Sequence, residues 1–166
     1  MACVVCDASC LIDLKKGQVL DALQRLPHRF IVPLPIREGE LPGFTAQDWR
    51  MLDDAGIDTF DLTDEQVTQV FALKQAHSRL SANDCFALVT ARQKNSILLT
   101  GNKLLRKVAT GRAVRAHGVL WIIDELCAAG ACQAGVLRSA LQIWRADAAV
   151  FLPVREIDRR LCCLGA

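Results

Sequence analysis

The stretch that decides the fold lies near the N-terminus, where residues 4–12 are VVCDASCLI. The apolar residues before Asp7 form the short run that is typical of a buried β-strand, and the apolar residues after it continue into a helical pattern. Asp7 therefore stands where a strand ends and the chain turns toward a helix. In an open α/β sheet, the carboxyl ends of the strands meet at one edge, and ligands bind there.

Three further segments place an acidic or amide side chain at the same kind of junction. They are PLPIRE at residues 33–38, SANDCFAL at residues 81–88 and LLTGNKLLR at residues 98–106. We therefore expect four side chains to converge in one cleft: Asp7, Glu38, Asp84 and Asn102. Clustered oxygen ligands suit a hard divalent cation such as Mg²⁺ or Mn²⁺. The pattern predicts a metal-dependent enzyme.

Composition limits the class of protein. The 166 residues, 52% hydrophobic and 23% charged, are typical of one globular domain with a sizeable core. The longest apolar stretches, such as residues 119–123, are much shorter than the roughly 20 residues that cross a bilayer. Asp7 also interrupts the N-terminus before a signal-peptide core could form. We expect a cytoplasmic protein with no membrane partner.

The order of predicted elements indicates the fold class. Strands are expected at residues 2–6, 29–32, 59–62 and 97–100. Helices are expected at residues 11–26, either interrupted or joined near Lys16-Gly17, after Pro35, at residues 64–78, at residues 81–91 and after Asn102. Residues 119–123 fit either a strand or the start of a helix. Alternating strands and helices favour a three-layer α/β/α sandwich with a central, mainly parallel sheet. We expect one domain over residues 1–166, with a helical C-terminal part from about residue 124.

The eight cysteines do not suggest a disulfide framework. Five of them lie in apolar runs, where thiols behave as small buried hydrophobes: Cys3, Cys6, Cys10, Cys85 and Cys127. We expect these five to be buried and the adjacent pair Cys162 and Cys163 to be exposed.

Charge is unevenly distributed, although the formal net charge is only +2. The segment after Asn102 has basic residues and no acidic ones: Lys103, Arg106, Lys107, Arg112, Arg115 and His117. A basic stripe beside a metal site is suited to a phosphate backbone. The alternative is an ordinary solvated helix face.

Three motifs together resemble the PIN domain. They are V-x-D-A-S-x-L-I from Val5, L-S-x-x-D-C-x-A-L-x-x-A from Leu80, and L-L-T-G-N-x-x-L-R from Leu98. The resemblance extends from about residue 4 to residue 117. It implies a parallel sheet flanked by helices, an acidic cleft that binds Mg²⁺ or Mn²⁺, and hydrolysis of phosphodiester bonds, usually in RNA. Many small members are the toxins of toxin–antitoxin pairs and act as dimers, while others act in RNA processing.

The resemblance also implies roles for individual residues. Asp7 and Asp84 are expected to bind metal, with Glu38 as the third acid, although Glu40 also fits the family's acid-leucine ending. Asn102 occupies the place where the family most often has aspartate, and an amide brings no charge to offset a cation.

Other residues are expected to support these four. Ser9 and Thr100 are expected to hydrogen-bond the metal-binding carboxylates or a phosphate. Lys103, Arg106 and Lys107 are expected to contact RNA.

Structural explanations remain open for the acids. Asp7 is placed to cap the helix that follows it, and Ser81-x-x-Asp84 is close to a capping box. Apolar residues of the C-terminal part fit either a dimer surface or the core: Leu137, Leu141, Ile143 and Trp144.

Three functions are consistent with the sequence. The first is a metal-dependent ribonuclease, including the toxin of a toxin–antitoxin pair, with RNA, an antitoxin protein and a second copy of the chain as partners. The second is a catalytically weakened RNA-binding or assembly module of the same fold. The third is a phosphatase with Asp7 as nucleophile, which is disfavoured because Ser9 stands where such enzymes need a second aspartate.

Overall fold

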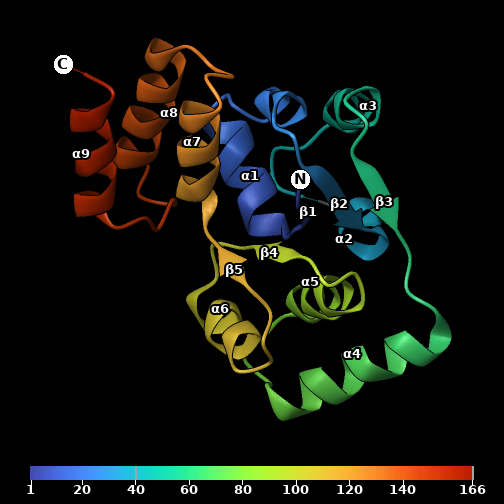
Figure 1. Cartoon of the computed structure of the whole chain (residues 1–166). Coiled ribbons are helices and arrows are strands. Elements are labelled where there is room, and N and C mark those ends of the chain that lie inside the picture. Colours follow the sequence, from blue (N-terminus) through green and yellow to red (C-terminus); the bar gives the residue numbers. More distant parts are fainter. Residues whose placement is uncertain (40, 166) are drawn as a thin grey trace.

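The computed structural model describes residues 1–39 and 41–165, and its centre is a parallel β-sheet (Figure 1). The sheet has five strands in the order β3-β2-β1-β4-β5. Their bounds are β1 Cys3–Cys6, β2 Arg29–Pro33, β3 Asp58–Phe60, β4 Ile97–Leu99 and β5 Ala116–His117. All four neighbouring pairs are parallel, so every strand ends at the same edge of the sheet.

Helices connect the strands and extend the chain beyond the last one. Their bounds are α1 Ala8–Lys16, the 3₁₀ helix η1 Asp21–Arg25, α2 Leu34–Glu38, α3 Ala46–Asp54, α4 Asp64–Ala76, α5 Ala82–Gln93, α6 Lys103–Thr110, α7 Val119–Ala128, α8 Ala134–Ala146 and α9 Val154–Cys163. The last three helices follow one another without a strand between them.

Strand β1 lies at the point where the strand order changes direction. From β1 the chain adds β2 and β3 on one side, whereas β4 and β5 lie on the other. Cys6 at the end of β1 is in register with Leu99 at the end of β4. A crevice is expected between two such strands because their connections leave in opposite directions. The residues that follow Cys6 and Leu99 therefore lie at the edge of this crevice, where ligands bind in folds of this kind.

Helices cover both faces of the sheet. Helix α5 contacts β1, β2 and β4 on one face, and α4 packs against the outer side of α5. On the other face, α1 contacts α7 and α8, and α9 packs on α8 (Figure 1). The three-layer α/β/α fold with a parallel central sheet, expected from the sequence, is confirmed.

The central strands are buried on both sides. Val4, Val5 and Cys6 of β1 have no exposed surface, nor have Leu98 and Leu99 of β4. Continuous apolar runs are required there because both faces are covered by helices. Burial of each such side chain stabilises the fold by about 1.5–3 kcal/mol.

The C-terminal helices belong to this core. Leu137, Leu141 and Trp144 of α8 are at most 1% exposed, so these side chains complete the core rather than form an exposed dimer surface. Ile143 is partly buried. The indole Nε1 of Trp144 donates a hydrogen bond to the backbone carbonyl of Asp13 at 2.7 Å, which joins α8 to the last turn of α1.

The structure decides two points that the sequence left open. Residues 119–123 form the start of helix α7, and the last strand is the two-residue β5 immediately before it. The helical region at residues 11–26 is interrupted at Gly17: α1 ends at Lys16, and a short 3₁₀ helix follows. Helix α3 was not predicted, although Thr45 and Asp48 form a capping box at its start.

The cysteines are free thiols. Cys6, Cys10 and Cys85 are buried, and Cys162 and Cys163 are exposed as expected. The prediction for Cys127 was wrong: it is exposed, because it lies on the outer face of α7 while Leu126 takes the buried position. Among the residues that the structure describes, no helix has both the length and the apolar character that a membrane crossing requires.

The contact of Gly17 with Trp144 yields a prediction about stability. A Cβ on Gly17 would lie 2.7 Å from Cε2 of Trp144, closer than two carbon atoms can approach. We expect Gly17→Ala to lower the free energy of unfolding by about 1–3 kcal/mol, because α8 must shift to relieve the overlap. Chemical denaturation monitored by circular dichroism measures this change.

Gly111→Ala is the matched control. Gly17 and Gly111 each follow a helix with ordinary right-handed dihedrals, at φ −72° and −63°. A Cβ on Gly111 would have its nearest neighbour at 3.6 Å, an ordinary contact. This control is expected to be neutral or stabilising by about 0.4–1 kcal/mol. Equal stability changes in the two variants would contradict the assigned packing of α8 on α1.

Candidate functional site

Asp7 is the first residue beyond β1, and its side chain is 2% exposed. Its backbone N–H donates to the carbonyl of Leu99 at 2.9 Å, so the pairing of β1 with β4 continues into this residue. Its carboxylate Oδ1 accepts a hydrogen bond from the N–H of Ala8 at 2.8 Å and caps α1. Capping is therefore one role of Asp7, but it uses only one of the two carboxylate oxygens.

The second oxygen of Asp7 is held by two hydroxyl groups. Ser9 Oγ donates to Asp7 Oδ2 at 2.9 Å, and Thr100 Oγ1 donates to the same oxygen at 2.8 Å. The N–H of Gly101 in turn donates to Ser9 Oγ at 3.0 Å. The structure thus brings Ser9 and Thr100 to the carboxylate of Asp7.

Asp84 is the third residue of helix α5 and is 8% exposed. Its Oδ2 accepts a hydrogen bond from the N–H of Ser81 at 2.7 Å, while its own N–H donates to Ser81 Oγ at 3.0 Å. This reciprocal pair is a complete capping box. Asp84 Oδ1 has no hydrogen-bond partner within the described residues, so that oxygen remains available to a ligand.

Asn102 connects Asp84 to the start of helix α6. Its Oδ1 accepts from the N–H groups of Leu104 and Leu105 at 3.0 and 3.3 Å and caps the helix. Its Nδ2 donates to Asp84 Oδ2 at 3.2 Å. The helix cap requires the carbonyl oxygen at this place, so the amide group necessarily points toward Asp84. Asn102 presents a donor to the acids, where an aspartate would present a third carboxylate.

The electrostatics of the site disfavour two negative charges. Burial raises the pKa of Asp7 above its ordinary value, and the nearby charge of Asp84 raises it further. The hydrogen bonds from Thr100, Ser9 and Ala8 act in the opposite direction. Neither Asp7 nor Asp84 forms an ion pair with any residue that the structure describes. A bound cation would offset the cost of ionising Asp7 beside Asp84.

Glu38 lies apart from this pair. It is the last residue of α2 and is exposed, and its side chain makes no ion pair or hydrogen bond in the parts of the chain that are described. Over the same residues, no group of three His, Cys, Asp or Glu side chains is close enough to hold a metal ion. Glu40, the alternative third acid, lies outside the described residues. Of the four predicted side chains, the structure therefore brings Asp7, Asp84 and Asn102 together.

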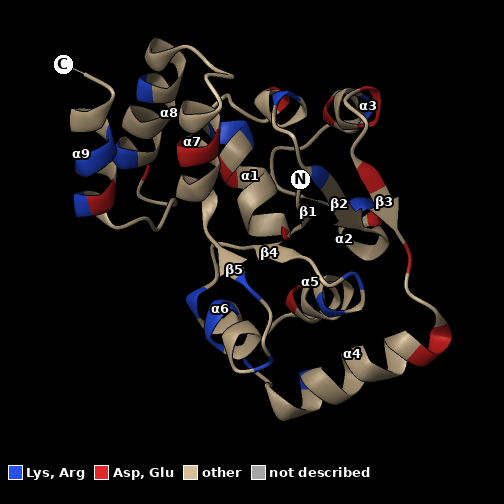
Figure 2. Ribbon diagram, in the orientation of Figure 1, with Lys and Arg blue, Asp and Glu red and all other residues tan. Residues whose placement is uncertain are grey.

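The predicted basic stripe is located on one side of the molecule. Figure 2 shows Lys and Arg in blue along α6 and along the connection from α6 to β5. Lys103 and Lys107 are exposed, whereas Arg106 is partly buried. Asn102 is the N-cap of α6, so the stripe begins directly beside the acids.

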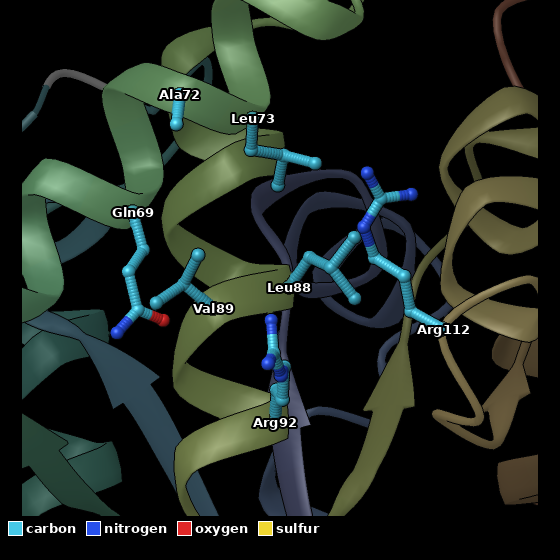
Figure 3. Close-up of a pocket in the computed structure, with 7 residues that line it drawn as sticks. All are labelled: Gln69, Ala72, Leu73, Leu88, Val89, Arg92 and Arg112. Carbon is cyan, nitrogen blue, oxygen red and sulfur yellow. The ribbon is translucent and has the colours of Figure 1, made fainter.

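One sizeable cavity is unrelated to the acids. It has a volume of about 370 Å³ and lies between α4 and α5, with Arg112 reaching in from the connection to β5 (Figure 3). Its lining residues are Gln69, Ala72, Leu73, Leu88, Val89, Arg92 and Arg112. None of the predicted site residues belongs to it.

Asp13 is a candidate that the sequence interpretation missed. It lies four residues after Ser9 on α1 and lines a hollow of about 230 Å³ together with Ser9, Lys16 and Gly101. Burial raises the pKa of Asp13 to about 6, against the opposing effect of Lys16. The spacing of Ser9 and Asp13 places both on one helix face, a signal that could have identified it.

Comparisons with known proteins identify the family of the chain. No curated protein matches the chain. Among solved structures, the chain is similar to a domain of a functionally unknown protein from Methanocaldococcus jannaschii DSM 2661, with 16% identity and a TM-score of 0.47 over 71% of this chain and 91% of that one. The model of the family DUF3368, described as a PIN domain, matches residues 3–152. The chain belongs to the PIN domain family.

Proposed function

We propose that this protein is a metal-dependent endoribonuclease. The observation that carries the proposal is the pair of buried carboxylates, Asp7 and Asp84, which lie together at the switch point of the sheet and form no ion pair with a Lys, Arg or His among the residues that the structure describes. PIN domains generally act as nucleases and typically depend on a divalent metal. The basic stripe on α6 begins beside the same pair, which favours a phosphate-rich substrate.

The residues present fit a hard cation. Asp7 and Asp84 supply carboxylate oxygens, of which Asp84 Oδ1 has no partner within the described part of the chain, and such donors select Mg²⁺ or Mn²⁺ over softer metals. We propose Asp7 and Asp84 as the residues that hold it; Glu38, the third acid that the resemblance implies, does not form a group of three with them within the described residues. A divalent cation at such a site polarises a phosphoryl oxygen and lowers the pKa of bound water.

The surrounding residues position the two acids. Ser9 and Thr100 fix the orientation of Asp7 through its Oδ2, and the N–H of Ser81 fixes Asp84. These contacts come from α1, from the end of β4 and from the start of α5. Side chains held in this way need little reorganisation when substrate binds, which favours catalysis. Lys103, Arg106 and Lys107 would hold the RNA backbone along α6.

We also propose a finer role, which membership of the PIN domain family suggests. The protein would be the toxin of a toxin–antitoxin pair, acting as a homodimer in the cytoplasm and inhibited by an antitoxin protein.

A second candidate function rests on Asn102. Its amide donates to Asp84 and so provides part of the stabilisation that a second cation would otherwise supply. Glu38 is not beside the pair. Both observations favour a catalytically weakened RNA-binding or assembly module over a two-metal nuclease.

Removal of the Asp84 charge tests the nuclease. We expect Asp84→Asn to reduce Mn²⁺-dependent cleavage of single-stranded RNA on the order of 100-fold or more, since one electrostatic element of the site is lost. The fold should survive, because Gln66 already provides an amide at the same capping position of α4. Cleavage is measured on denaturing gels, with and without a chelator.

Asp48→Asn is the matched control, because Asp48 occupies the equivalent capping-box position of α3. It loses a salt bridge to Lys15 but should cleave RNA like the wild type. Cleavage that persists in Asp84→Asn or in the presence of chelator would exclude this site as its source. Absence of cleavage in the wild type would favour the module.

A second prediction concerns the residue at position 102. We expect Asn102→Asp to lower the free energy of unfolding of the metal-free protein by about 1–3 kcal/mol, because a hydrogen bond to Asp84 is replaced by charge repulsion. Mn²⁺ should then raise the melting temperature more in this variant than in the wild type. Thermal unfolding over a Mn²⁺ titration measures both effects.

Asn102→Ser is the control that distinguishes the effect of charge at position 102 from the effect of the helix cap. Serine also caps helices well but contributes neither the amide donor nor a carboxylate. This variant should gain no Mn²⁺ response. If Asn102→Asp responds to Mn²⁺ no more strongly than Asn102→Ser, residue 102 does not face the metal.

A further inference from the structure

A second hollow borders the acid site on the side of the C-terminal helices. It has a volume of about 410 Å³, within the range of small-ligand sites. Gly101, between Thr100 and Asn102, is part of its wall. The other lining residues come from α6, from the stretch β5 to α7, from the segment before α9 and from α9 itself: Arg106, His117, Gly118, Leu120, Trp121, Asp124, Phe151, Leu152, Pro153, Glu156 and Arg160.

One of its two arginines is free of acidic partners. Arg160 donates to both carboxylate oxygens of Asp124, at 2.7 and 2.6 Å, and to Glu156 at 3.0 Å. Arg106 forms no ion pair within the described residues, and its Nη1 lies 3.3 Å from the position of a Cβ on Gly118. The absence of a side chain at Gly118 leaves room for the guanidinium there. The arginine of the hollow without an acidic partner therefore lies against Gly118, in a hollow whose wall includes Gly101.

The hollow also contains one aromatic ring that is free to bind. Phe151 is 82% exposed, which is unusual for a phenylalanine outside an interface. Trp121 is less available, since the rings of His117 and His28 stack on its indole, with centroids 4.9 and 5.5 Å away. Phe151 also lines the smaller hollow that holds Ser9 and Asp13, so it borders the acid site from two directions.

We propose that this hollow binds one nucleotide of a single-stranded RNA next to the cleaved bond, with the phosphate on Arg106 and the base stacked on Phe151. The inference rests on the proposed function for its substrate. An unpaired arginine and an exposed aromatic ring are the two groups that such sites use, the first for the backbone and the second for the base. The C-terminal part of the chain would thus select and hold substrate for the acids of the sheet.

Binding of RNA without metal tests the stacking. The probe is a fluorescently labelled single-stranded RNA of about 12 nucleotides, long enough to fill such a groove, in the presence of a chelator. By fluorescence anisotropy, we expect Phe151→Ala to raise Kd roughly 5- to 100-fold, the effect of losing one base stack. The matched control is Phe71→Ala on α4, which removes another exposed phenylalanine, 63% exposed, and should leave Kd unchanged.

The salt dependence of the same binding tests the phosphate contact. Arg106→Gln should reduce the slope of log Kd against log salt concentration by about 0.7, the value for one phosphate contact on a single strand. Arg92→Gln, at the end of α5 remote from the acids, is the control and should retain the slope. Circular dichroism and melting temperature verify that each variant is folded.

RNAs with one base removed test whether Phe151 stacks on a base. An abasic site that weakens wild-type binding should cause no further loss in Phe151→Ala. The proposal is overturned if Phe151→Ala binds as tightly as Phe71→Ala, if Arg106→Gln keeps the wild-type slope, or if the wild type does not bind the RNA.

Cleavage is measured separately and distinguishes this inference from the proposed function. If Asp84→Asn abolishes metal-dependent cleavage but Phe151→Ala binds RNA normally, the proposed nuclease function is supported and the proposed nucleotide subsite is excluded. Weakened binding by Phe151→Ala with no cleavage by the wild type would retain the subsite on a non-catalytic module.

Discussion

The pairing of β1 with β4 is the constraint on which the rest of the site depends. It places Asp7 beside the end of β4, where the N–H of Asp7 bonds the carbonyl of Leu99 and Thr100 Oγ1 bonds the Asp7 carboxylate. Two residues separated by 93 positions are thereby held at hydrogen-bond distance. The next residues along, Gly101 and Asn102, then begin the loop and helix that bring the basic stripe to the acids. A shift of one residue in this register would move Thr100 away from Asp7 and turn the buried side chains of β4 to the opposite face.

Burial of the acids in the site lowers the stability of the fold. Two carboxylates lie almost completely buried, and burial together with the charge of Asp84 raises the pKa of Asp7. Hydrogen bonds from hydroxyl and backbone donors offset part of this loss of stability. Such partial compensation is common at preorganised polar sites. Asn102 lowers the cost further, because its amide meets Asp84 with a donor in place of a third negative charge. At position 102, the amide that favours folding stability is therefore less favourable than a carboxylate for binding a cation.

The two halves of the chain contribute different parts of the proposed machinery. The sheet and the first turns of α1, α5 and α6 hold the acids and Asn102 by means of helix caps and strand ends. The helices that follow β5 contribute apolar side chains to the core and Phe151 to the hollow beside Gly101. The hydrogen bond from Trp144 to Asp13 fixes the second part against the first. The acids and the hollow that we propose for RNA are therefore built largely from different parts of the chain.

The sequence by itself determined the parallel α/β fold, the order of most elements and the convergence of Asp7, Ser9, Asp84, Thr100 and Asn102, because strand ends and helix caps are local signals and parallel strands share one edge. Only the tertiary structure decided that Asn102 turns its amide toward Asp84, that Glu38 lies apart from the acids, and that Phe151 and Arg106 border one hollow. It also decided that residues 119–123 are helical, since a short apolar run has no distinguishing period. Side-chain direction and contact across long loops depend on packing, which adds information that no local pattern of residues contains.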